Sequence, residues 1–302
     1  MTHTPVSRAA VVVNPTKLED DEAFRKSVRQ VMDDHGWDEP LWLETTPEDP
    51  GRGQAESAVS AGADLVLACG GDGTVTACAE GVTGTGVPLA IIPMGTGNLL
   101  ARNVGLPMDL DGALAVALGG AQQPVDAGRV NGTLFVVMAG LGLDAQMLSG
   151  TSDTLKKRLG WFAYAISAAR HLGDRPVRVT VSADGGTRRR MRVSALIVGN
   201  VGMLRGGLPL LPDARPDDGK LDAVVLVAGG LAGWLAVAAD ILLRRPARGR
   251  IYRVQFSELR ATLSRREPWE LDGEVMGSTG RLTVVAQPGA LRLRTPPEPA
   301  DP

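Results

Sequence analysis

The sequence has few thiols and few imidazoles. It contains only two cysteines, Cys69 and Cys78, in 302 residues. This number excludes a disulfide framework, and the spacing of the two thiols matches no metal-ligand motif. The histidines are limited to His3, His35 and His171, which lack the spacing of a zinc site or a catalytic triad. The scarcity of cysteine favours a protein of the reducing cytoplasm.

The sequence also lacks a large excess of charge, a secretory signal and an uninterrupted apolar span. Its net charge of -2 gives no global attraction for nucleic acid or an anionic membrane, so any such contact must be local, at Arg188 to Arg192 or Arg244 to Arg250. The N-terminus lacks the basic start and apolar stretch of a signal peptide. Asp240 and several glycines interrupt the run from Val224 to Leu243, which is better explained as a strand followed by an amphipathic helix. We expect no transmembrane span and no nucleic-acid partner.

Length and patterning predict two domains, because 302 residues exceed what one hydrophobic core usually organises. The first third alternates apolar runs with amphipathic stretches, which is typical of βα units and a parallel sheet. The expected strands are Ala9 to Val13, Leu41 to Leu43, Leu65 to Cys69 and Leu89 to Ile92; the expected helices include Asp21 to Asp34 and Gly53 to Ala61. We predict an α/β nucleotide-binding domain over residues 1–125.

The hydrophobic pattern of the sequence changes after Val125. Strand-like runs predominate: Leu134 to Met138, Val177 to Val181, Val193 to Val198, Leu221 to Val227 and Leu282 to Val285. One helix-like stretch, Leu155 to His171, carries Trp161 and Phe162, which could rest on a membrane but are explained more simply by ordinary packing. We predict a β-rich domain over residues 126–287 and a disordered tail over residues 296–302.

Small polar residues or glycines follow each strand of the predicted parallel sheet. These segments are Asn14 to Lys17, Thr45-Thr46, Gly70 to Thr74 and Gly95 to Asn98. The carboxyl ends of parallel strands share one edge, where ligands bind in open α/β sheets. A single such turn would be explained by turn preference alone, but four in series favour a phosphate-bearing ligand.

The run Gly70-Gly71-Asp72-Gly73-Thr74 comes between a strand and a helix-compatible stretch. Glycines let a backbone approach a ligand closely, and the amides at a helix start point toward it. The run matches neither the dinucleotide-binding nor the P-loop fingerprint. Because Asp72 would repel phosphates, we expect a compensating cation, with magnesium the natural candidate.

These turns occur in one order with Gly140 to Ala145, Asp217 to Asp222 and Leu271 to Glu274. The ordered set, which covers nearly the whole chain, resembles the diacylglycerol kinase catalytic-domain family, which includes bacterial lipid kinases and sphingosine kinases. The glycine pentapeptide alone is shared with NAD kinases and phosphofructokinases. The resemblance implies an α/β domain of that type and a β-rich lipid-binding domain, with ATP near the cleft and Asp144 at the acceptor pocket. It also implies that the segment at about 288–295 returns to the first domain.

The resemblance implies catalytic and nucleotide-binding roles. Asp272 would be the general base for the attacking hydroxyl, and Glu274 with Asp72 would help to hold magnesium. Spacing alone favours a plain hairpin turn at Asp272-Gly273. Asn98 is explained equally well as a helix N-cap, and Lys17 as a solvated lysine. The implied contacts to ATP are Asn14, Thr16, Thr45, Gly70, Gly71, Asp72, Gly73, Thr74, Gly95, Thr96 and Asn98.

A second magnesium site is also implied, together with departures from the family pattern. Asp218 and the carbonyl of Lys220 match positions that hold a structural magnesium in bacterial members, and the carbonyl of Arg215 would be the third ligand. An ordinary loop turn explains this segment equally well.

Thr76-Ala77 replaces an Asn-Glu pair of many relatives, and Leu99 replaces an acidic residue of some. These changes point to a less characterised branch.

The sequence thus predicts an enzyme that uses ATP and Mg²⁺ to phosphorylate a lipid hydroxyl at the membrane surface. Diacylglycerol is the leading acceptor, and phosphatidic acid would be the product. The alternatives are an NAD kinase-like enzyme and a catalytically inactive nucleotide-binding regulatory protein. We expect a cytoplasmic location, with peripheral membrane association and a homodimer both left open.

Overall fold

The computed structural model describes residues 7–142, 176–204, 207–242 and 249–297. The expected helix from Leu155 to His171, Asp144 and the end of the tail lie outside the described residues. The chain forms two compact units: a first unit of residues 1–125 and 289–302, and a second unit of residues 126–288. The predicted combination of an α/β domain with a β-rich domain is confirmed.

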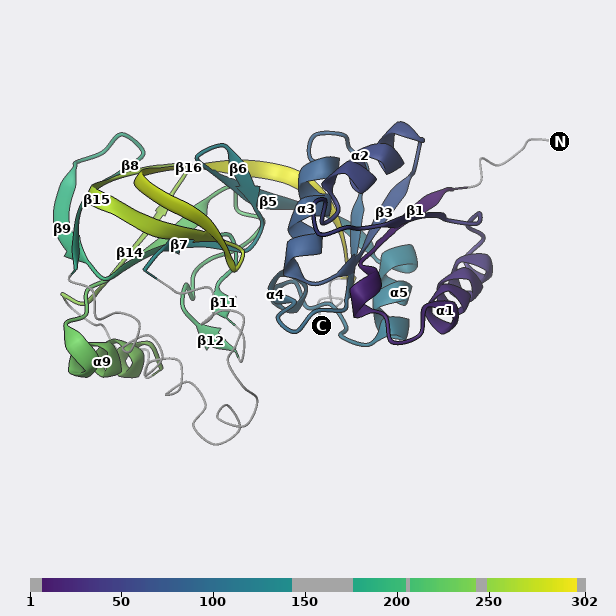
Figure 1. Ribbon diagram of the computed structural model, residues 1–302, viewed down its shortest axis with the longest axis horizontal. Coiled ribbons are helices and arrows are strands. Elements are labelled where there is room, and N and C mark those ends of the chain that lie inside the picture. Colours follow the sequence, from purple (N-terminus) through teal and green to yellow (C-terminus); the bar gives the residue numbers. More distant parts are fainter. Residues whose placement is uncertain (1–6, 143–175, 205–206, 243–248, 298–302) are drawn as a thin grey trace. The chain divides into compact units, whose positions relative to one another are not determined.

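A parallel sheet with helices on both faces forms the first unit. Its strand order is β16-β4-β3-β1-β2, and the end of β16 joins in parallel through the pair Leu293 and Leu89. Helices α1 and α5 share a core with one face of the sheet, and α2 and α3 pack together as a second layer. Figure 1 shows these helix pairs on opposite sides of the strands. The elements are β1 (Ala9–Val13), α1 (Asp21–Asp34), β2 (Leu41–Glu44), α2 (Arg52–Ser60), β3 (Leu65–Gly70), α3 (Asp72–Val82), β4 (Leu89–Pro93), α4 (Leu99–Asn103) and α5 (Leu110–Gly119), with a 3-10 turn, η1, at Pro15–Lys17.

The sequence of α1 explains its position. Its N-cap, Asp20, accepts a hydrogen bond from the N–H of Ala23 at 2.9 Å, which satisfies one of the free donors at the helix start. Phe24, Val28 and Met32 recur every four residues and are buried against the sheet. The predicted bounds of α1 and its buried face are therefore confirmed.

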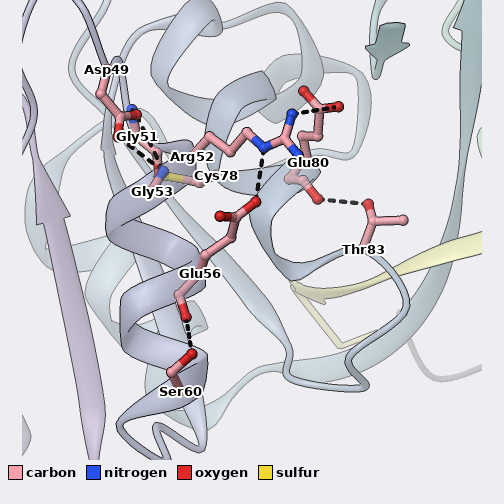
Figure 2. A network of polar contacts seen from close by, with 10 residues as sticks. Asp49, Gly51, Arg52, Gly53, Glu56, Ser60, Cys78, Glu80 and Thr83 are labelled. Carbon is pink, nitrogen blue, oxygen red and sulfur yellow. Dashed lines mark hydrogen bonds and ion pairs between the residues drawn. The ribbon is translucent and has the colours of Figure 1, made fainter. Parts of the chain in front are cut away.

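Helix α2 fixes α3, the helix that begins at the glycine pentapeptide. Figure 2 shows the carboxylate of Asp49 accepting hydrogen bonds from the N–H groups at the start of α2, while Arg52 forms ion pairs with Glu56 and Glu80. A Cβ on Gly81 of α3 would lie 2.7 Å from the backbone oxygen of Arg52, so only glycine permits this close helix contact. The C-terminal part of α3 is thus held against α2, away from the glycine turn at which the helix begins.

A mostly antiparallel sheet organises the second unit. The order β14-β13-β10-β7-β15-β16 forms its main path, and β15 also pairs with β8, which pairs with β9. Phe135, Phe256 and Trp269 lie in its core. The elements are β5 (Ala121–Val130), β6 (Thr133–Phe135), β7 (Met138–Leu141), β8 (Val177–Ala183), β9 (Arg189–Val193), β10 (Ala195–Gly199), β11 (Met203–Leu204), β12 (Leu208–Pro209), β13 (Leu221–Leu226), α9 (Gly230–Leu242), β14 (Ile251–Phe256), β15 (Glu258–Leu271) and β16 (Glu274–Thr295).

Two apolar runs that predict single strands are each divided. The run from Leu134 to Met138 becomes β6 and β7, because the N–H groups of its middle residues bind a side chain and not a neighbouring strand. The run from Val193 to Val198 divides at Ser194, whose hydroxyl donates to the carbonyl of Ala228 at 2.7 Å. The segment from Val224 onward is a strand followed by a helix, as expected. Across the part of the chain that the structure describes, no helix is both long enough and apolar enough to span a bilayer.

Candidate active site

The register of the parallel sheet brings the four predicted turns to one edge. Val13 pairs with Glu44 on one side and with Cys69 on the other, and Cys69 pairs with Ile92. The first residues beyond these strands continue the pattern. The N–H of Asn14 donates to the carbonyl of Cys69 at 3.0 Å, and that of Thr45 donates to the carbonyl of Val13 at 2.9 Å. The turns therefore leave the sheet side by side.

The pentapeptide and the turn at Gly95 touch through their backbones. A Cβ on Gly95 would lie 2.5 Å from the Cα of Gly71, and a Cβ on Gly70 would lie 2.6 Å from the side chain of Thr74. Any residue larger than glycine would force these segments apart. Thr74 is 4% exposed, so its side chain fills the space beside Gly70. The glycines are required by this close approach and not by positive φ angles.

The N-terminus of α3 presents backbone donors at this edge. Its N-cap, Gly71, supplies no side-chain hydrogen bond, and the first backbone bond of the helix runs from the N–H of Val75 to the carbonyl of Gly71. Among the described residues, no acceptor binds the N–H groups of Gly73 and Thr74. Free amides and the positive end of the helix dipole favour an anion here.

Asp72 links the two glycine turns. Its Oδ1 accepts a hydrogen bond of 2.6 Å from the N–H of Leu99, at the start of α4. Burial raises the pKa of Asp72, while the N–H groups of Leu99 and Asn98 oppose this shift. The side chain of Leu99 is buried and only its backbone contacts Asp72. Leu99, which stands where some relatives have an acidic residue, therefore still donates this backbone hydrogen bond to Asp72.

The side chain of Asn98 holds its own turn together. Its Oδ1 accepts from the N–H of Gly95 at 2.9 Å, and its Nδ2 donates to the carbonyl of Gly95 at 2.8 Å. Asn98 has a φ of 49°, in the left-handed region, which asparagine tolerates better than most residues. Asn98 occupies the N-cap position of α4, as the alternative expected, but its side chain makes no capping hydrogen bond to that helix.

The remaining predicted contacts differ in exposure. Asn14 accepts hydrogen bonds from the N–H and the hydroxyl of Thr16, at 3.1 and 2.8 Å. Thr16 and Thr96 are exposed at the edge, whereas Thr45 is 6% exposed. Sequence reasoning missed Arg102, whose Nε donates to the carbonyl of Gly97 at 3.0 Å. Arg102 adds a cation beside the second glycine turn.

Asp272, in the second unit, occupies a two-residue hairpin turn between β15 and β16. Asp272 and Gly273 have φ angles of 47° and 92°, and the flanking residues Leu271 and Glu274 pair with each other. Positive φ at both central residues is typical of the tight turns that favour Asp-Gly. The hairpin expected from spacing is therefore present, and Glu274 is exposed at the start of β16.

The carboxylate of Asp272 binds the segment between β6 and β7. Its Oδ1 accepts from the N–H groups of Val137 and Met138 at 3.0 and 2.8 Å, and its Oδ2 accepts from the N–H of Val136 at 3.1 Å. The N–H of Asp272 donates to the carbonyl of Met138 at 2.8 Å. These bonds fix the carboxylate and stabilise its negative charge.

Asn200 supports the same segment from its other side. Its N–H donates to the carbonyl of Val137 at 2.9 Å, and its Nδ2 donates to the carbonyls of Val136 and Asp126 at 3.2 and 2.7 Å. Asn200 and Asp126 are 1% and 3% exposed, and the Oδ2 of Asp126 accepts from the N–H of Gly219. Sequence reasoning missed both residues, although a single acid or amide inside an apolar run could have drawn attention to them.

In the loop expected to hold a structural magnesium, Asp218 accepts hydrogen bonds from within the loop and from β14. Asp218 accepts from the N–H of Lys220 at 3.0 Å and from the Nε2 of Gln255 at 2.8 Å. Burial, followed by the charges of Asp218 and Asp213, raises the pKa of nearby Asp222. No cluster of three or more His, Cys, Asp or Glu side chains suited to a metal occurs in the described ranges. The bond from Lys220 is typical of a turn, whereas the bond from Gln255 joins the loop to β14, and the second magnesium site stays a prediction.

Two family models match this chain. The diacylglycerol kinase catalytic domain matches residues 8–130, and the YegS C-terminal NAD kinase beta sandwich-like domain matches residues 136–295. A Pseudomonas putida protein named "Probable lipid kinase YegS-like" is 32% identical over 296 residues, covering 96% of each chain. A Bacillus subtilis protein named "Diacylglycerol kinase" is 29% identical over 280 residues, covering 90% of this chain and 91% of the relative.

Solved structures share the fold. A diacylglycerol kinase from Bacillus anthracis str. Sterne aligns with a TM-score of 0.76 and 24% identity, covering 97% of this chain and 98% of that one. An NAD kinase from Archaeoglobus fulgidus, solved in complex with ATP, aligns with a TM-score of 0.51 and 15% identity, covering 95% and 93%. At these identities the likeness concerns architecture alone, and it confirms the expected NAD kinase-like fold.

Proposed function

The chain belongs to the family that joins a diacylglycerol kinase catalytic domain to a YegS C-terminal domain, and we propose that it transfers the γ-phosphate of ATP to a lipid hydroxyl. Diacylglycerol is the proposed acceptor, and phosphatidic acid the product. Named relatives are lipid and diacylglycerol kinases, which favours a lipid acceptor over NAD.

The main support from the structure is the pair of touching glycine turns beside the N-terminus of α3. Gly71 and Gly95 let the two turns pack backbone against backbone, and the N–H groups of Gly73 and Thr74 offer donors to phosphate oxygens. We assign the triphosphate to this edge of the sheet. The proposed ATP contacts are Asn14, Thr16, Thr45, Gly70, Gly71, Asp72, Gly73, Thr74, Gly95, Thr96 and Asn98, with Arg102 added by the structure.

Magnesium bound with the nucleotide fits this edge of the sheet because Asp72 supplies a carboxylate there. Magnesium in kinases usually uses one or two carboxylates together with substrate phosphates, and not a cage made wholly of protein. Asp72 offers one carboxylate, of which Oδ1 already binds the N–H of Leu99. We assign the metal to Asp72 and the phosphates, and Glu274 is proposed as a further catalytic acid. Bound magnesium would neutralise charge on the phosphates.

Asp272 is the proposed general base. The proton of the lipid hydroxyl passes to its carboxylate while the hydroxyl oxygen attacks the γ-phosphorus. The bond between that phosphorus and the bridging oxygen of ADP breaks, so that ADP leaves and the lipid carries the phosphate. A positioned base contributes roughly 10²- to 10⁴-fold to such a step. Hydrogen bonds from Val136, Val137 and Met138 support the assignment, because they hold the carboxylate in one orientation.

A product assay tests the function. Purified protein receives labelled ATP with either diacylglycerol in mixed micelles or NAD, and the labelled products are separated. We expect labelled phosphatidic acid, and labelled NADP without any lipid phosphate would refute the proposal. ATP binding without transfer to any alcohol of a whole lipid extract, analysed by mass, would instead favour the inactive regulatory protein.

A further inference from the structure

One outer face of the second unit is rich in arginine. In the β8–β9 hairpin, Arg178 lies directly opposite Arg192, and Arg190 lies opposite Thr180. The ladder continues across β15 and β16, where Thr180 pairs with Thr262 and Thr262 pairs with Arg281. Figure 1 shows β9, β8, β15 and β16 on the same side of this unit. We call Arg178, Arg190, Arg192, Arg260 and Arg281 the arginine face; all five are exposed.

Strand alternation separates this face from the core. Val177, Val179 and Val193 alternate with the arginines of β8 and β9 and are buried within the unit. The residues between the arginines on the outer side are small hydroxyl side chains, namely Thr180, Ser182, Thr262 and Thr283. With strands about 4.8 Å apart and alternate residues about 7 Å apart, the face extends roughly 14 Å in each direction.

The charges on the face are poorly balanced. Arg260 forms an ion pair with Glu258, but the structure, over the residues it describes, gives Arg178, Arg190, Arg192 and Arg281 no acidic partner. Like charges directly opposite each other destabilise a sheet, so the pair of Arg178 and Arg192 has a cost in the isolated protein. A local excess of this kind stands out in a chain whose net charge is -2. An anionic partner would remove the cost.

We propose that the arginine face docks the second unit on the anionic phospholipid surface of a bilayer. The choice of a bilayer rests on the proposed function, since a lipid acceptor resides there. Guanidinium groups bind phosphate oxygens in bidentate fashion, and arginines near an anionic leaflet gain from its surface potential. The broad face of a sheet also suits a flat partner.

A nucleic acid is a poorer match for the same residues. Proteins that bind single strands stack bases on aromatic side chains, and no member of the arginine face or of the hydroxyl set between its members is aromatic. Reading a duplex in its major groove takes a protruding helix or two-stranded ribbon, whereas these arginines lie across four adjacent strands. Lipid phosphates therefore explain the face better than nucleic-acid phosphates do.

Vesicle binding by the full chain tests the proposal. The probes are phosphatidylcholine vesicles with and without phosphatidylglycerol, and the variant carries Arg178→Gln, Arg190→Gln and Arg192→Gln together. The matched control carries Arg8→Gln, Lys26→Gln and Arg292→Gln, which remove the same charge from exposed positions of the first unit. Thermal unfolding of each variant establishes that it is folded, and transfer to a water-soluble short-chain diacylglycerol reports on catalysis without a membrane.

We expect the protein to bind only the anionic vesicles and to release them as salt rises. The face variant should lose affinity by on the order of 100-fold, because each arginine contributes severalfold at an anionic surface. The control should change by less than about threefold, and the face variant should unfold at an unchanged or higher temperature because a repulsive pair is gone.

Other outcomes separate this inference from the proposed function. Equal vesicle binding by the face variant and the control would overturn the docking surface, even if both phosphorylate the soluble lipid. Tighter binding of the wild-type protein to duplex DNA or RNA than to anionic vesicles would overturn it as well. Loss of vesicle binding in the face variant alone, in a protein that phosphorylates no lipid, would uphold the docking surface and refute the kinase.

Discussion

Replacing Asp272 with Asn separates a catalytic role from a structural one. Asparagine tolerates the left-handed conformation, and Asn-Gly favours the same tight turn as Asp-Gly. Its single oxygen can still accept from Val137 and Met138, but its amide group would face the N–H of Val136. Losing one hydrogen bond to a charged acceptor costs about 1.5–3 kcal/mol. At roughly 2–4 °C per kcal/mol, the melting temperature should fall by about 3–12 °C.

The expected loss of activity is much larger than this loss of stability can explain. A domain with about 5 kcal/mol of stability would retain about 2 kcal/mol and remain more than about nine-tenths folded. Removing a general base lowers kcat by roughly 10²- to 10⁴-fold. We therefore expect Asp272→Asn to keep its affinity for ATP and to lose kcat on that scale, measured with labelled ATP and micellar diacylglycerol at a temperature below unfolding.

Asp184 is a matched control in the same unit. It also has a positive φ, 48°, and precedes a glycine; its Oδ1 accepts from the N–H groups of Ser257 and Glu258, and its N–H donates to the carbonyl of Glu258. Asp184→Asn should leave kcat unchanged. The reasoning fails if Asp272→Asn keeps kcat within a few-fold of wild type, or if both variants lose kcat in parallel.

Three further variants test the surrounding structure. Gly95→Ala should lower the free energy of unfolding by about 1–3 kcal/mol and weaken ATP binding at least about tenfold, because its Cβ would lie 2.5 Å from the backbone of Gly71. The control is Gly229→Ala, whose Cβ enters open space and should change neither quantity. Thermal melts and nucleotide titrations measure the two effects. Asp72→Asn should raise the melting temperature at neutral pH while lowering turnover. Burial raises the pKa of Asp72 in the folded protein, so ionised Asp72 destabilises the fold. This destabilisation is absent below the ordinary pKa of aspartate and grows as the pH rises through the pKa of the folded state. Thermal melts across pH should therefore show that the stability gained by Asp72→Asn vanishes in acid. Asn200→Ala removes the Nδ2 donor to the buried carbonyl of Val136 and should lower the free energy of unfolding by about 1–3 kcal/mol. A fall in kcat with unchanged KM for ATP would support a positioning role for Asn200, and an unchanged kcat would refute it.

The first unit was largely predictable from sequence because its signals are local. The strand from Ala9 to Val13 and the helix from Asp21 to Asp34 have the expected bounds, since a buried apolar run and an amphipathic repeat with an acidic N-cap each specify one element. Parallel pairing then places the turns at one edge, as expected. The roles of individual residues in that edge stay predictions.

The arrangement within the candidate site depends on contacts between distant segments, which local patterns do not encode. Asp272 binds N–H groups more than a hundred residues away, and these bonds interrupt the strand expected from Leu134 to Met138. Asn98 matches an N-cap by position, yet its side chain folds back on Gly95. The arginine cluster was visible in sequence from Arg188 to Arg192, but only the pairing with Arg178 places these charges on one face.

The return of β16 to the first unit affects how the chain folds during synthesis. Leu293 pairs with Leu89 at the edge of the parallel sheet, and about 200 residues separate them. At roughly 5–20 residues per second, the ribosome needs about 10–40 s to deliver this final strand after β4 has emerged. Throughout that interval β4 is an unpaired sheet edge, which is a site for mispairing and aggregation. Nascent chains stalled before Leu291 should therefore depend on chaperones more than the completed chain does.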